Sequence, residues 1–280
     1  MKTFHIGGIP IQLFGLTIAI GVMVGLYIVV REAKRKNMNQ EDLTDLALYT
    51  VIVGIIGARL NYILAFNPSY YLSNPLEILM IQNGGLSIQG SLIAGIIFAL
   101  WYMNRKKMDI GKTADVFAPA IIMGQAIGRI GCDVFGVEMN RVWPWGVNVA
   151  GRLLHPAQIY EAILNYILFM VLWNKRKKLY YNGQLFVIYL IGFSMNRFIV
   201  EFFRTNPMVA GPISIAHLYS LGLVAGAIAL RWYFQKKDDN PQSNGANATV
   251  KIEVRDLKRD NIMVIGMMIL SVFIYYFIHR

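Results

Sequence analysis

The chain is poor in the residues from which disulfide-stabilised and metal-binding proteins are built. Its 280 residues include one cysteine, Cys132, and four histidines. A single cysteine cannot form an internal disulfide, and no two histidines have the spacing that lets them share a metal ion. The sequence therefore predicts neither a metal site nor a bound cofactor.

Charge is also scarce. Only 15% of the residues are charged and 56% are hydrophobic, and the mean hydropathy is +0.46. This composition excludes an ordinary soluble domain and predicts a polytopic helical membrane protein. The formal net charge of +11 comes mostly from basic clusters that follow alternate apolar runs, within 31–36, 105–112, 175–178 and 231–237. Such clusters mark cytoplasmic loops beside membrane lipid, so no nucleic-acid partner is expected.

Eight apolar runs are present, and most of them approach the ~20 residues that span a bilayer as a helix. They cover 10–30, 46–66, 86–103, 114–130, 159–173, 184–203, 215–234 and 262–278. The runs are too long for membrane strands and lack their alternation of polar and apolar residues. The predicted fold is an all-α, multi-pass transmembrane bundle, with seven core helices, an appended eighth helix and the N-terminus outside.

Three segments follow from this pattern. Residues 1–235 form the predicted core, 236–261 a cytoplasmic polar linker, and 262–280 a C-terminal transmembrane anchor. The linker is rich in polar and turn-forming residues and ends in a weakly strand-like alternation over 249–257. The last run carries no charge, which favours a simple anchor.

Charged residues recur within or beside the other runs, which is costly in hydrocarbon and usually functional. The set is Arg59, Arg129, Arg197, Arg204, Glu161, Glu201 and His155. Arg197, Glu201 and Arg204 are spaced i, i+4, i+7 and share one helical face. Because arginines outnumber acids and guanidinium suits phosphate, the set predicts an anion-binding cavity near the outer membrane face. A network that only locks helices together is the alternative.

Several glycines lie near these charges, and each would let a ligand or another helix approach the backbone closely. Gly85 and Gly90 lie in the run Gly84–Gly90 before the third span, and Gly128 precedes Arg129. Such glycines admit a ligand near the backbone, or equally serve tight turns and close helix packing.

Simpler roles fit three other features. Asp115 reads as a favourable charge near the start of its own helix, and Cys132 as a small buried residue. The connection 131–158 carries Trp143 and Trp145, which predict an amphipathic or re-entrant element at the interface.

Several motifs together resemble those of prolipoprotein diacylglyceryl transferase. They occur in the expected order at Gly84–Gly90, Gly124–Gly131, His155–Glu161 and Arg197–Arg204, within a resemblance that covers about 10–235. The resemblance implies a seven-helix enzyme of the bacterial cytoplasmic (inner) membrane. Its substrates would be phosphatidylglycerol and the lipobox cysteine of a preprolipoprotein, and its products a thioether-linked lipid and glycerol phosphate.

The resemblance also implies roles for the buried charges. Arg129 corresponds to the arginine that binds phosphatidylglycerol, and Arg197 to a catalytic arginine. Arg204 and Glu201 would brace that helix, while Glu161 would neutralise surplus positive charge. Residues Gly85, Gly90 and Gly128 are expected at the substrate.

The chain departs from the family pattern on the side that would activate the thiol. Gln89 stands where the family usually has histidine, and Phe14 and Phe193 stand where it has tyrosines. Gln89 hydrogen-bonds but is no base near neutral pH, so Glu138, Asp133 and His155 are the alternative bases.

Three explanations stay open. The chain is a working transferase, a paralogue that uses the same lipid donor with another acceptor, or a phospholipid-binding protein without catalysis. An anion transporter is a fourth, and charges lining both halves of the bundle would favour it.

Overall fold

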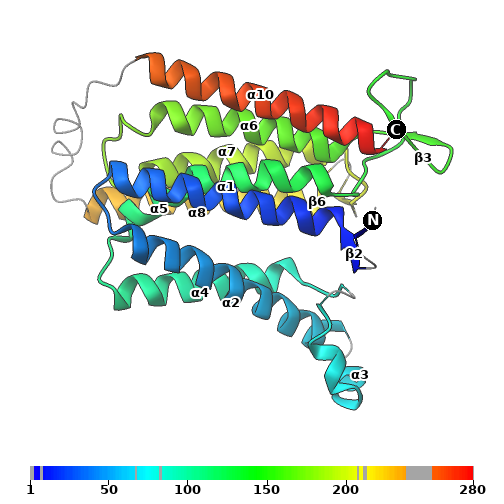
Figure 1. Cartoon of the computed structure of the whole chain (residues 1–280), viewed down its shortest axis with the longest axis horizontal. Helices are drawn as coiled ribbons and strands as arrows, with labels where there is room; N and C mark the ends of the chain where they lie inside the picture. Colours follow the sequence, from blue (N-terminus) through cyan, green and yellow to red (C-terminus); the bar gives the residue numbers. More distant parts are fainter. Residues whose placement is uncertain are drawn as a thin grey trace. The chain divides into compact units, whose positions relative to one another are not determined.

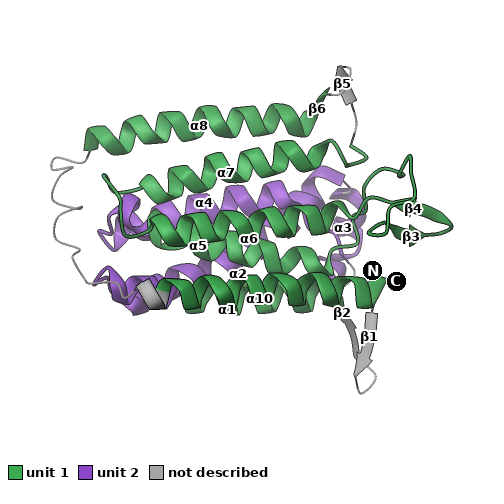
Figure 2. Cartoon of the chain, turned by 90° about the horizontal axis from the view of Figure 1, so that it is seen from above, with its two compact units in different colours: residues 1–28, 114–280 green, residues 29–113 purple. Residues whose placement is uncertain are grey.

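The computed structural model describes residues 3–6, 9–66, 68–81, 84–206, 208–210, 213–237 and 254–279 (Figure 1). The chain divides into two compact units, Met1–Ile28 with Ala114–Arg280 (unit 1) and Val29–Thr113 (unit 2), which Figure 2 colours separately. In the part of the chain described, every predicted apolar run lies largely within a helix of at least 18 residues. Five of these helices are long and apolar enough to cross a membrane by length and composition alone. The predicted all-α, polytopic fold is confirmed.

The long helices are α1 (Leu13–Arg35), α2 (Gln40–Phe66), α4 (Ile88–Arg105), α5 (Ile110–Gly128), α6 (Ala157–Lys175), α7 (Gln184–Glu201), α8 (Ile215–Lys237) and α10 (Val254–His279). Short helical turns are α3 (Pro68–Ser73), η1 (Pro75–Ile78) and η3 (Arg129–Gly131). Three antiparallel hairpins complete the described part, and they pair β1 (Thr3–Ile6) with β2 (Ile9–Gln12), β3 (Val147–Val149) with β4 (Arg152–Leu154), and β5 (Met208–Ala210) with β6 (Ile213–Ser214).

Unit 2 is built on the close packing of α2 against α4. A side chain at Gly90 would collide with the backbone of Gly57 and with Asn61, and one at Gly57 would collide with Ala94. Small residues let two membrane helices approach until their backbones touch. Gly90 therefore serves helix packing, and its place at a substrate stays a prediction.

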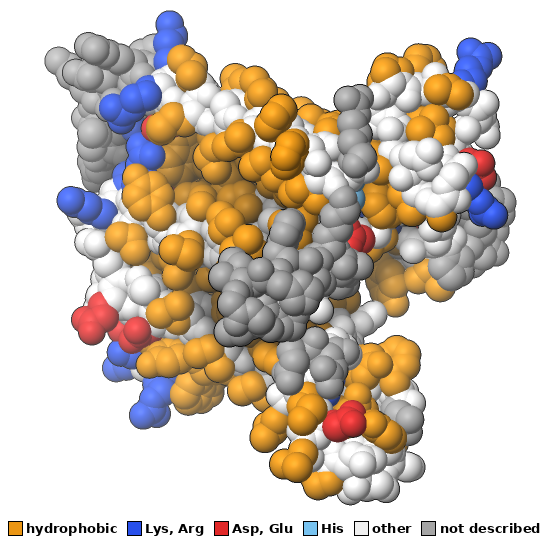
Figure 3. Space-filling model, turned by 45° about the vertical axis from the view of Figure 1, so that its right-hand side comes forward, with side chains coloured by type: hydrophobic (Ala, Val, Ile, Leu, Met, Phe, Trp, Pro, Cys, Tyr) orange, Lys and Arg blue, Asp and Glu red, His pale blue; other side chains and the backbone are white. Residues whose placement is uncertain are grey.

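Unit 1 contains α6, α7, α8, α10 and the hairpins, together with most of α1 and most of α5. Within it α6 packs against both α7 and α10, and α7 packs against α8. Helices α1 and α5 cross closely, because a side chain at Gly21 would lie 2.8 Å from the carbonyl oxygen of Gly124. In the described part of the face shown in Figure 3, hydrophobic side chains predominate, and most lysines and arginines lie at its edges. This distribution suits a surface in contact with lipid.

The connection after η3 is a turn followed by the β3–β4 hairpin. Its reversal at Ala150 and Gly151 uses positive φ angles of 51° and 81°. The Trp143 and Trp145 rings stack with their centroids 4.8 Å apart. The two tryptophans that predicted an amphipathic or re-entrant element lie in the turn before the hairpin, where the Gly146 amide donates to the Trp143 carbonyl (3.1 Å). An amphipathic or re-entrant element at the interface stays a prediction.

The C-terminal part differs from its predicted boundaries. Helix α8 extends to Lys237 and α10 begins at Val254, so both ends of the predicted linker are helical, while 238–253 lie outside the described residues. The strand-like alternation predicted over 249–257 is wrong from Val254 onward. Helix α10 also buries Asp260, which is 3% exposed. The expectation of a last helix without buried charge is therefore wrong.

Asp115 has a different role from the one its position in the sequence predicts. Its carboxylate accepts hydrogen bonds from the backbone amides of Gly183 (3.0 Å), Leu185 (2.8 Å) and Phe186 (3.1 Å). It therefore caps α7, not its own helix. Gly183 is the N-cap residue of α7, with a φ of 91°, and a side chain there would collide with Phe234. Because glycine has no side chain to satisfy the first amides, a carboxylate from α5 does so.

We predict that Asp115→Ala lowers the free energy of unfolding by about 1–3 kcal/mol, because it leaves buried amides without an acceptor. Thermal unfolding in detergent measures the change. Glu41→Ala is the control, because Glu41 is an exposed acid in the first turn of α2. Equal losses in the two variants would contradict the assigned cap.

Candidate functional site

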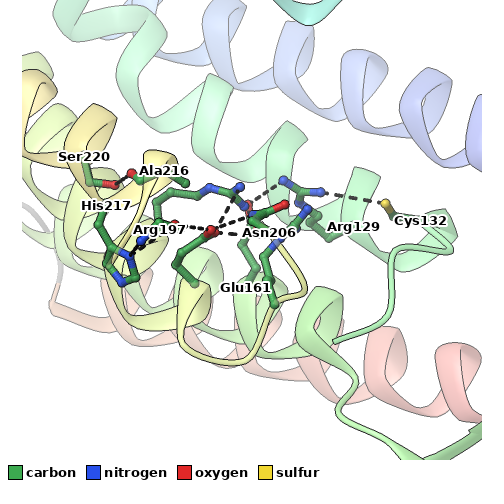
Figure 4. A network of polar contacts seen from close by, with 11 residues as sticks. Arg129, Cys132, Glu161, Arg197, Asn206, Ala216, His217 and Ser220 are labelled. Atoms are coloured by element: carbon green, nitrogen blue, oxygen red, sulfur yellow. Dashed lines mark hydrogen bonds and ion pairs between the residues drawn. The ribbon is translucent and has the colours of Figure 1, made fainter. Parts of the chain in front are cut away.

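Three arginines of unit 1 converge on two buried glutamates (Figure 4). The shortest ion pair joins Arg129 Nη2 to Glu161 Oε1 at 2.7 Å. The other carboxylate oxygen of Glu161 lies 3.6 Å from Arg197 and 3.9 Å from Arg204. Glu201 Oε2 faces the same two arginines at 3.4 Å and 3.9 Å. We call these five residues the arginine cluster.

Separate elements supply the members of the cluster. Arg129 opens η3 directly after α5, Glu161 lies in the second turn of α6, and Arg197 and Glu201 are one turn apart on α7. Helix α7 ends at Glu201, so Arg204 extends from the turn beyond it. The prediction from the i, i+4, i+7 spacing that the three side chains share one side still holds. The chain keeps a helix-like turn after α7, because the amides of 203 and 204 donate to the carbonyls of 200 and 201.

Glu201 is held by residues that the sequence reasoning missed. Its Oε1 accepts hydrogen bonds from Asn206 Nδ2 and Ser214 Oγ, both at 2.6 Å. His217 Nδ1 accepts the Ser214 amide at 3.0 Å, and its ring lies against Phe198 and Phe202. Helical spacing gave no signal for these partners, since they lie in or beside the segment after α7. They leave Glu201 with one oxygen directed at the arginines.

The cluster has a surplus of positive charge and of hydrogen-bond donors. Three guanidinium groups face two carboxylates. Among the described residues, buried nitrogens of Arg197 (Nη1) and Arg204 (Nε and Nη1) have no hydrogen-bond acceptor, and the facing oxygens of Glu161 and Glu201 have no hydrogen-bond donor in suitable geometry. Buried donors without acceptors are costly. Chemically, this arrangement attracts an anion with several oxygens.

Cys132 lies beside the first arginine. Its sulfur is 3.8 Å from Arg129 Nη1, and the residue is 7% exposed. The interpretation of Cys132 as a small buried residue is confirmed, and its contact with the cluster is an addition to it.

Gly128 directly precedes η3 and Gly131 ends it, and the two glycines have different surroundings. A side chain at Gly131 would collide with Thr17 and lie 2.8 Å from the Leu13 carbonyl oxygen on α1. At Gly128 the nearest such atom, on Ile18, is 3.9 Å away. Gly124 and Gly131 therefore serve close helix packing, whereas Gly128, for which this was one of two predicted roles, has room for a side chain.

Arg59 belongs to unit 2, where it fastens the loop after η1. Its Nε donates to the Ile78 carbonyl (3.0 Å), and its Nη1 donates to the carbonyls of Gly84 (2.7 Å) and Gly85 (3.1 Å). Nη2 donates to the Glu77 carbonyl. Because each guanidinium nitrogen has a backbone acceptor, the contacts support a role in shaping this loop. Its role as an anion ligand stays a prediction.

The glycine-rich segment of unit 2 contains a tight turn. Gly84 and Gly85 have φ angles of 86° and 76°, and a side chain at Gly85 would meet Arg59 at 2.6 Å. Gln89 is exposed and accepts a hydrogen bond from Ser87 (2.9 Å), which in turn accepts one from Asn61 (2.7 Å). The structure thus orients Gln89, and its part in catalysis stays a prediction.

His155 and Glu138 lie on neighbouring segments of the connection between η3 and α6. His155 Nδ1 is 3.1 Å from the Tyr160 hydroxyl, and its ring lies 5.2 Å from Phe203. Burial lowers the pKa of His155, so its ring is neutral at pH 7. Glu138 is exposed in a β-bridge opposite Leu154. The contact of His155 with Tyr160 favours a hydrogen-bonding role at the entry to α6.

A comparison with family models adds a decisive observation. A model described as prolipoprotein diacylglyceryl transferase matches residues 1–233. The chain belongs to the prolipoprotein diacylglyceryl transferase family. The predicted resemblance is confirmed, and with it the expectation of an enzyme of the transferase class.

Three relatives share the name phosphatidylglycerol--prolipoprotein diacylglyceryl transferase. The protein of Clostridioides difficile is 36% identical over 239 residues, which cover 85% of this chain and 96% of the relative. That of Bacillus cytotoxicus is 35% identical over 80% of this chain and 88% of its own length. That of Finegoldia magna is 33% identical over 84% and 95%. The family match contains the whole arginine cluster and ends before α10.

We predict that Gly131→Ala lowers both thermal stability and transferase activity, because the added methyl group pushes η3 away from α1 and displaces Arg129. The loss of stability should be about 1–3 kcal/mol, as for other overpacked sites. Gly128→Ala is the control, and its added methyl group fits. Unfolding in detergent and product formation by mass spectrometry measure both effects. A Gly128→Ala variant as impaired as Gly131→Ala would contradict this packing.

Proposed function

We propose that the chain transfers the diacylglyceryl group of phosphatidylglycerol to the thiol of a lipobox cysteine in a preprolipoprotein. The protein is a multi-pass membrane protein, and bacterial relatives carry this activity in their names. In unit 1 the arginine cluster lies at the opposite end of α6 from the basic residues 175–178, about 21 Å along the axis from Glu161 to Lys175. The basic end is proposed to be cytoplasmic, which puts the cluster and the N-terminus outside.

The observation that carries the proposal is the surplus of buried guanidinium donors in the arginine cluster. A phosphodiester headgroup offers the oxygens that Arg197 and Arg204 lack. Guanidinium groups match phosphate geometry, and their interaction strengthens where water is excluded. Arg129, with a side chain 28% exposed, is proposed to contact the same headgroup at the edge of the cluster.

The proposed reaction forms one carbon–sulfur bond and breaks one carbon–oxygen bond. The acceptor sulfur attacks the glycerol carbon that is esterified to phosphate, after its proton has passed to water or a base. Glycerol phosphate leaves with the bonding electron pair and gains one negative charge. Arg129 and Arg197 stabilise this developing charge, which is the usual effect of fixed positive groups on a transition state.

The glutamates are proposed to position the arginines. Glu161 holds Arg129 by a short ion pair, and Glu201 restrains Arg197 from the next turn of α7. A guanidinium held in one geometry needs no reorganisation when charge develops on the phosphate. The surplus charge would also favour the thiolate form of an approaching cysteine.

We predict that Arg129→Ala lowers transfer by about 100-fold or more, as loss of one transition-state donor does, while the protein still inserts and folds. The assay uses protein in nanodiscs with phosphatidylglycerol and a lipobox peptide, and mass spectrometry detects the diacylglyceryl peptide. Arg141→Ala is the control, because it removes an exposed arginine from the nearby connection.

Four results would contradict the proposal in whole or in part. Transfer at the original rate by Arg129→Ala would show that this arginine holds no headgroup. Failure of the unmodified gene to support a bacterium depleted of its own lipoprotein diacylglyceryl transferase would show that the acceptor is not a preprolipoprotein. Loss of phosphatidylglycerol headgroup without a lipidated peptide would indicate a different acceptor, and binding without loss a protein that does not catalyse.

A second prediction concerns Gln89, whose part on the thiol side rests on the resemblance. Gln89→His should raise transfer to a lipobox peptide at pH 7 by about tenfold, because imidazole accepts a proton near neutral pH. This gain is smaller than the ~100-fold or more that a well-positioned general base contributes. Gln89→Leu is the control and should lower transfer, because it removes the hydrogen-bonding group. A rate with histidine no higher than with glutamine would show that residue 89 does not handle the thiol proton.

A further inference from the structure

Helix α10 lies beyond the family match, yet it is joined to α6 by buried polar contacts along its length (Figure 1). At one end Asp260 accepts a hydrogen bond from Trp173 Nε1 at 2.9 Å. In the middle the hydroxyls of Tyr166 and Ser271 are 2.8 Å apart. A helix that served only as an anchor would need no such contacts, since polar groups are costly in lipid. Their number indicates a fixed docking of α10 in one register.

The last turns of α10 make two contacts near the arginine cluster. The hydroxyl of Tyr275 accepts a hydrogen bond from Gln158 Nε2 at 2.6 Å, and both residues are fully buried. His279 Nε2 lies 2.9 Å from a carboxylate oxygen of Asp133, and its Nδ1 lies 3.0 Å from the carbonyl oxygen of Tyr275. The His279 ring is only 8% exposed and stacks on that of Tyr275.

Each contact involves a residue that lies three or four positions along the chain from Arg129 or Glu161, the partners of the shortest ion pair. Gln158 precedes Glu161 by three residues on α6, so the two lie about one helical turn apart. Asp133 follows Cys132, whose sulfur contacts Arg129. Helix α10 therefore holds both the segment that carries Glu161 and the segment that follows Arg129.

We propose that α10 is a built-in brace of the transferase site, in which His279 and Tyr275 are positioning residues for Arg129 and Glu161. This inference rests on the proposed function for its catalytic consequence. His279 bonded to Asp133 fixes the segment that leaves η3, and Tyr275 bonded to Gln158 fixes the first turns of α6. Loss of either bond lets the Arg129–Glu161 pair move relative to Arg197, and displacements of about 1 Å are enough to slow an enzyme severely.

The test compares three variants of the full-length protein in nanodiscs. His279→Ala removes the bond to Asp133, and His279→Gln keeps a nitrogen donor at a similar distance from the backbone. Phe277→Ala is the matched control on the same turn, since Phe277 is 79% exposed and faces away from the contacts. We expect His279→Ala to lower kcat/KM for phosphatidylglycerol by about tenfold or more, and His279→Gln to restore most of it.

A second readout is independent of activity. Cys132 is the only cysteine of the chain, it is buried, and Asp133 follows it directly. The rate at which a maleimide labels Cys132 therefore reports release of this segment. We expect faster labelling in His279→Ala than in the unmodified chain, and unchanged labelling in His279→Gln and Phe277→Ala.

A double-mutant cycle tests whether the pair acts as one unit. If His279 acts through Asp133, adding His279→Ala to Asp133→Ala should change labelling and transfer little beyond the Asp133→Ala variant alone. Fully additive losses would contradict this coupling. Tyr275→Phe supplies a second test of the brace that leaves His279 intact, and it too should lower transfer.

The outcomes separate the brace from the proposed function. If the unmodified chain transfers no lipid, the proposed function fails, and the labelling rates still decide whether α10 holds the segment. If His279→Ala matches Phe277→Ala in both labelling and transfer, the brace is wrong. Faster labelling with unchanged transfer would also overturn it, because the contact would then position no group that matters for the reaction.

Discussion

Glu161 is the group on which the arrangement of charges in unit 1 depends. It is 1% exposed and lies on a helix with a largely apolar surface. A carboxylate in such surroundings is tolerable only when cations surround it. Its partners come from η3, from α7 and from the turn after α7, so its requirement for positive charge fixes three separate segments at once. Removal of this carboxylate would leave Glu201 as the one acid of the cluster opposite three guanidinium groups.

The surrounding packing is arranged so that these segments can meet. Gly131 lets η3 lie against α1, and Gly136 lets its strand lie against the Phe203 carbonyl, where any side chain would collide. Polar contacts then fix the registers that apolar packing alone leaves loose. Ser214 and Asn206 orient Glu201, and Asp115 starts α7 at a defined residue. Each of these contacts joins residues that a lipid environment would not solvate, so each contributes to a unique arrangement.

The sequence predicted those features whose physical signal is local. Hydrophobic length located every long helix, and the spacing of Arg197, Glu201 and Arg204 placed them on one side. Features that depend on distant partners were missed or misread. Gln158 and Tyr275 are 117 residues apart, and the sequence around each of them does not predict the hydrogen bond between them.

Asp115 and Asp260 also show that the sequence does not reveal hydrogen-bond partners that are distant along the chain. Asp115 stands near the start of its own helix, where a helix charge is the natural interpretation, yet it caps a helix 68 residues further on. Asp260 precedes an apolar run and resembles the end of a polar linker, yet it is buried against Trp173. In both cases the position of an acid along one helix is visible in the sequence, whereas the donor that reaches it is set by tertiary packing. Arg59 is a third example, because its carbonyl acceptors lie 18 to 26 residues later in an irregular loop.

The ion-pair distances within the arginine cluster differ, and this difference suits an enzyme that must release a phosphate. Arg129 is bound closely to Glu161 at 2.7 Å, whereas Arg197 and Arg204 lie 3.4–3.9 Å from their carboxylates. Three arginines without acids would hold a leaving phosphate too firmly to turn over. Three arginines that were each fully neutralised by an acid would attract no headgroup. On the proposed function, the carboxylate oxygens that lie 3.4–3.9 Å from Arg197 and Arg204 would leave these donors to the substrate and would compete for them once the product carries its extra charge, so binding energy would be used mainly while charge develops. On the proposed function, the acids of the cluster therefore matter as much for release as the arginines do for binding.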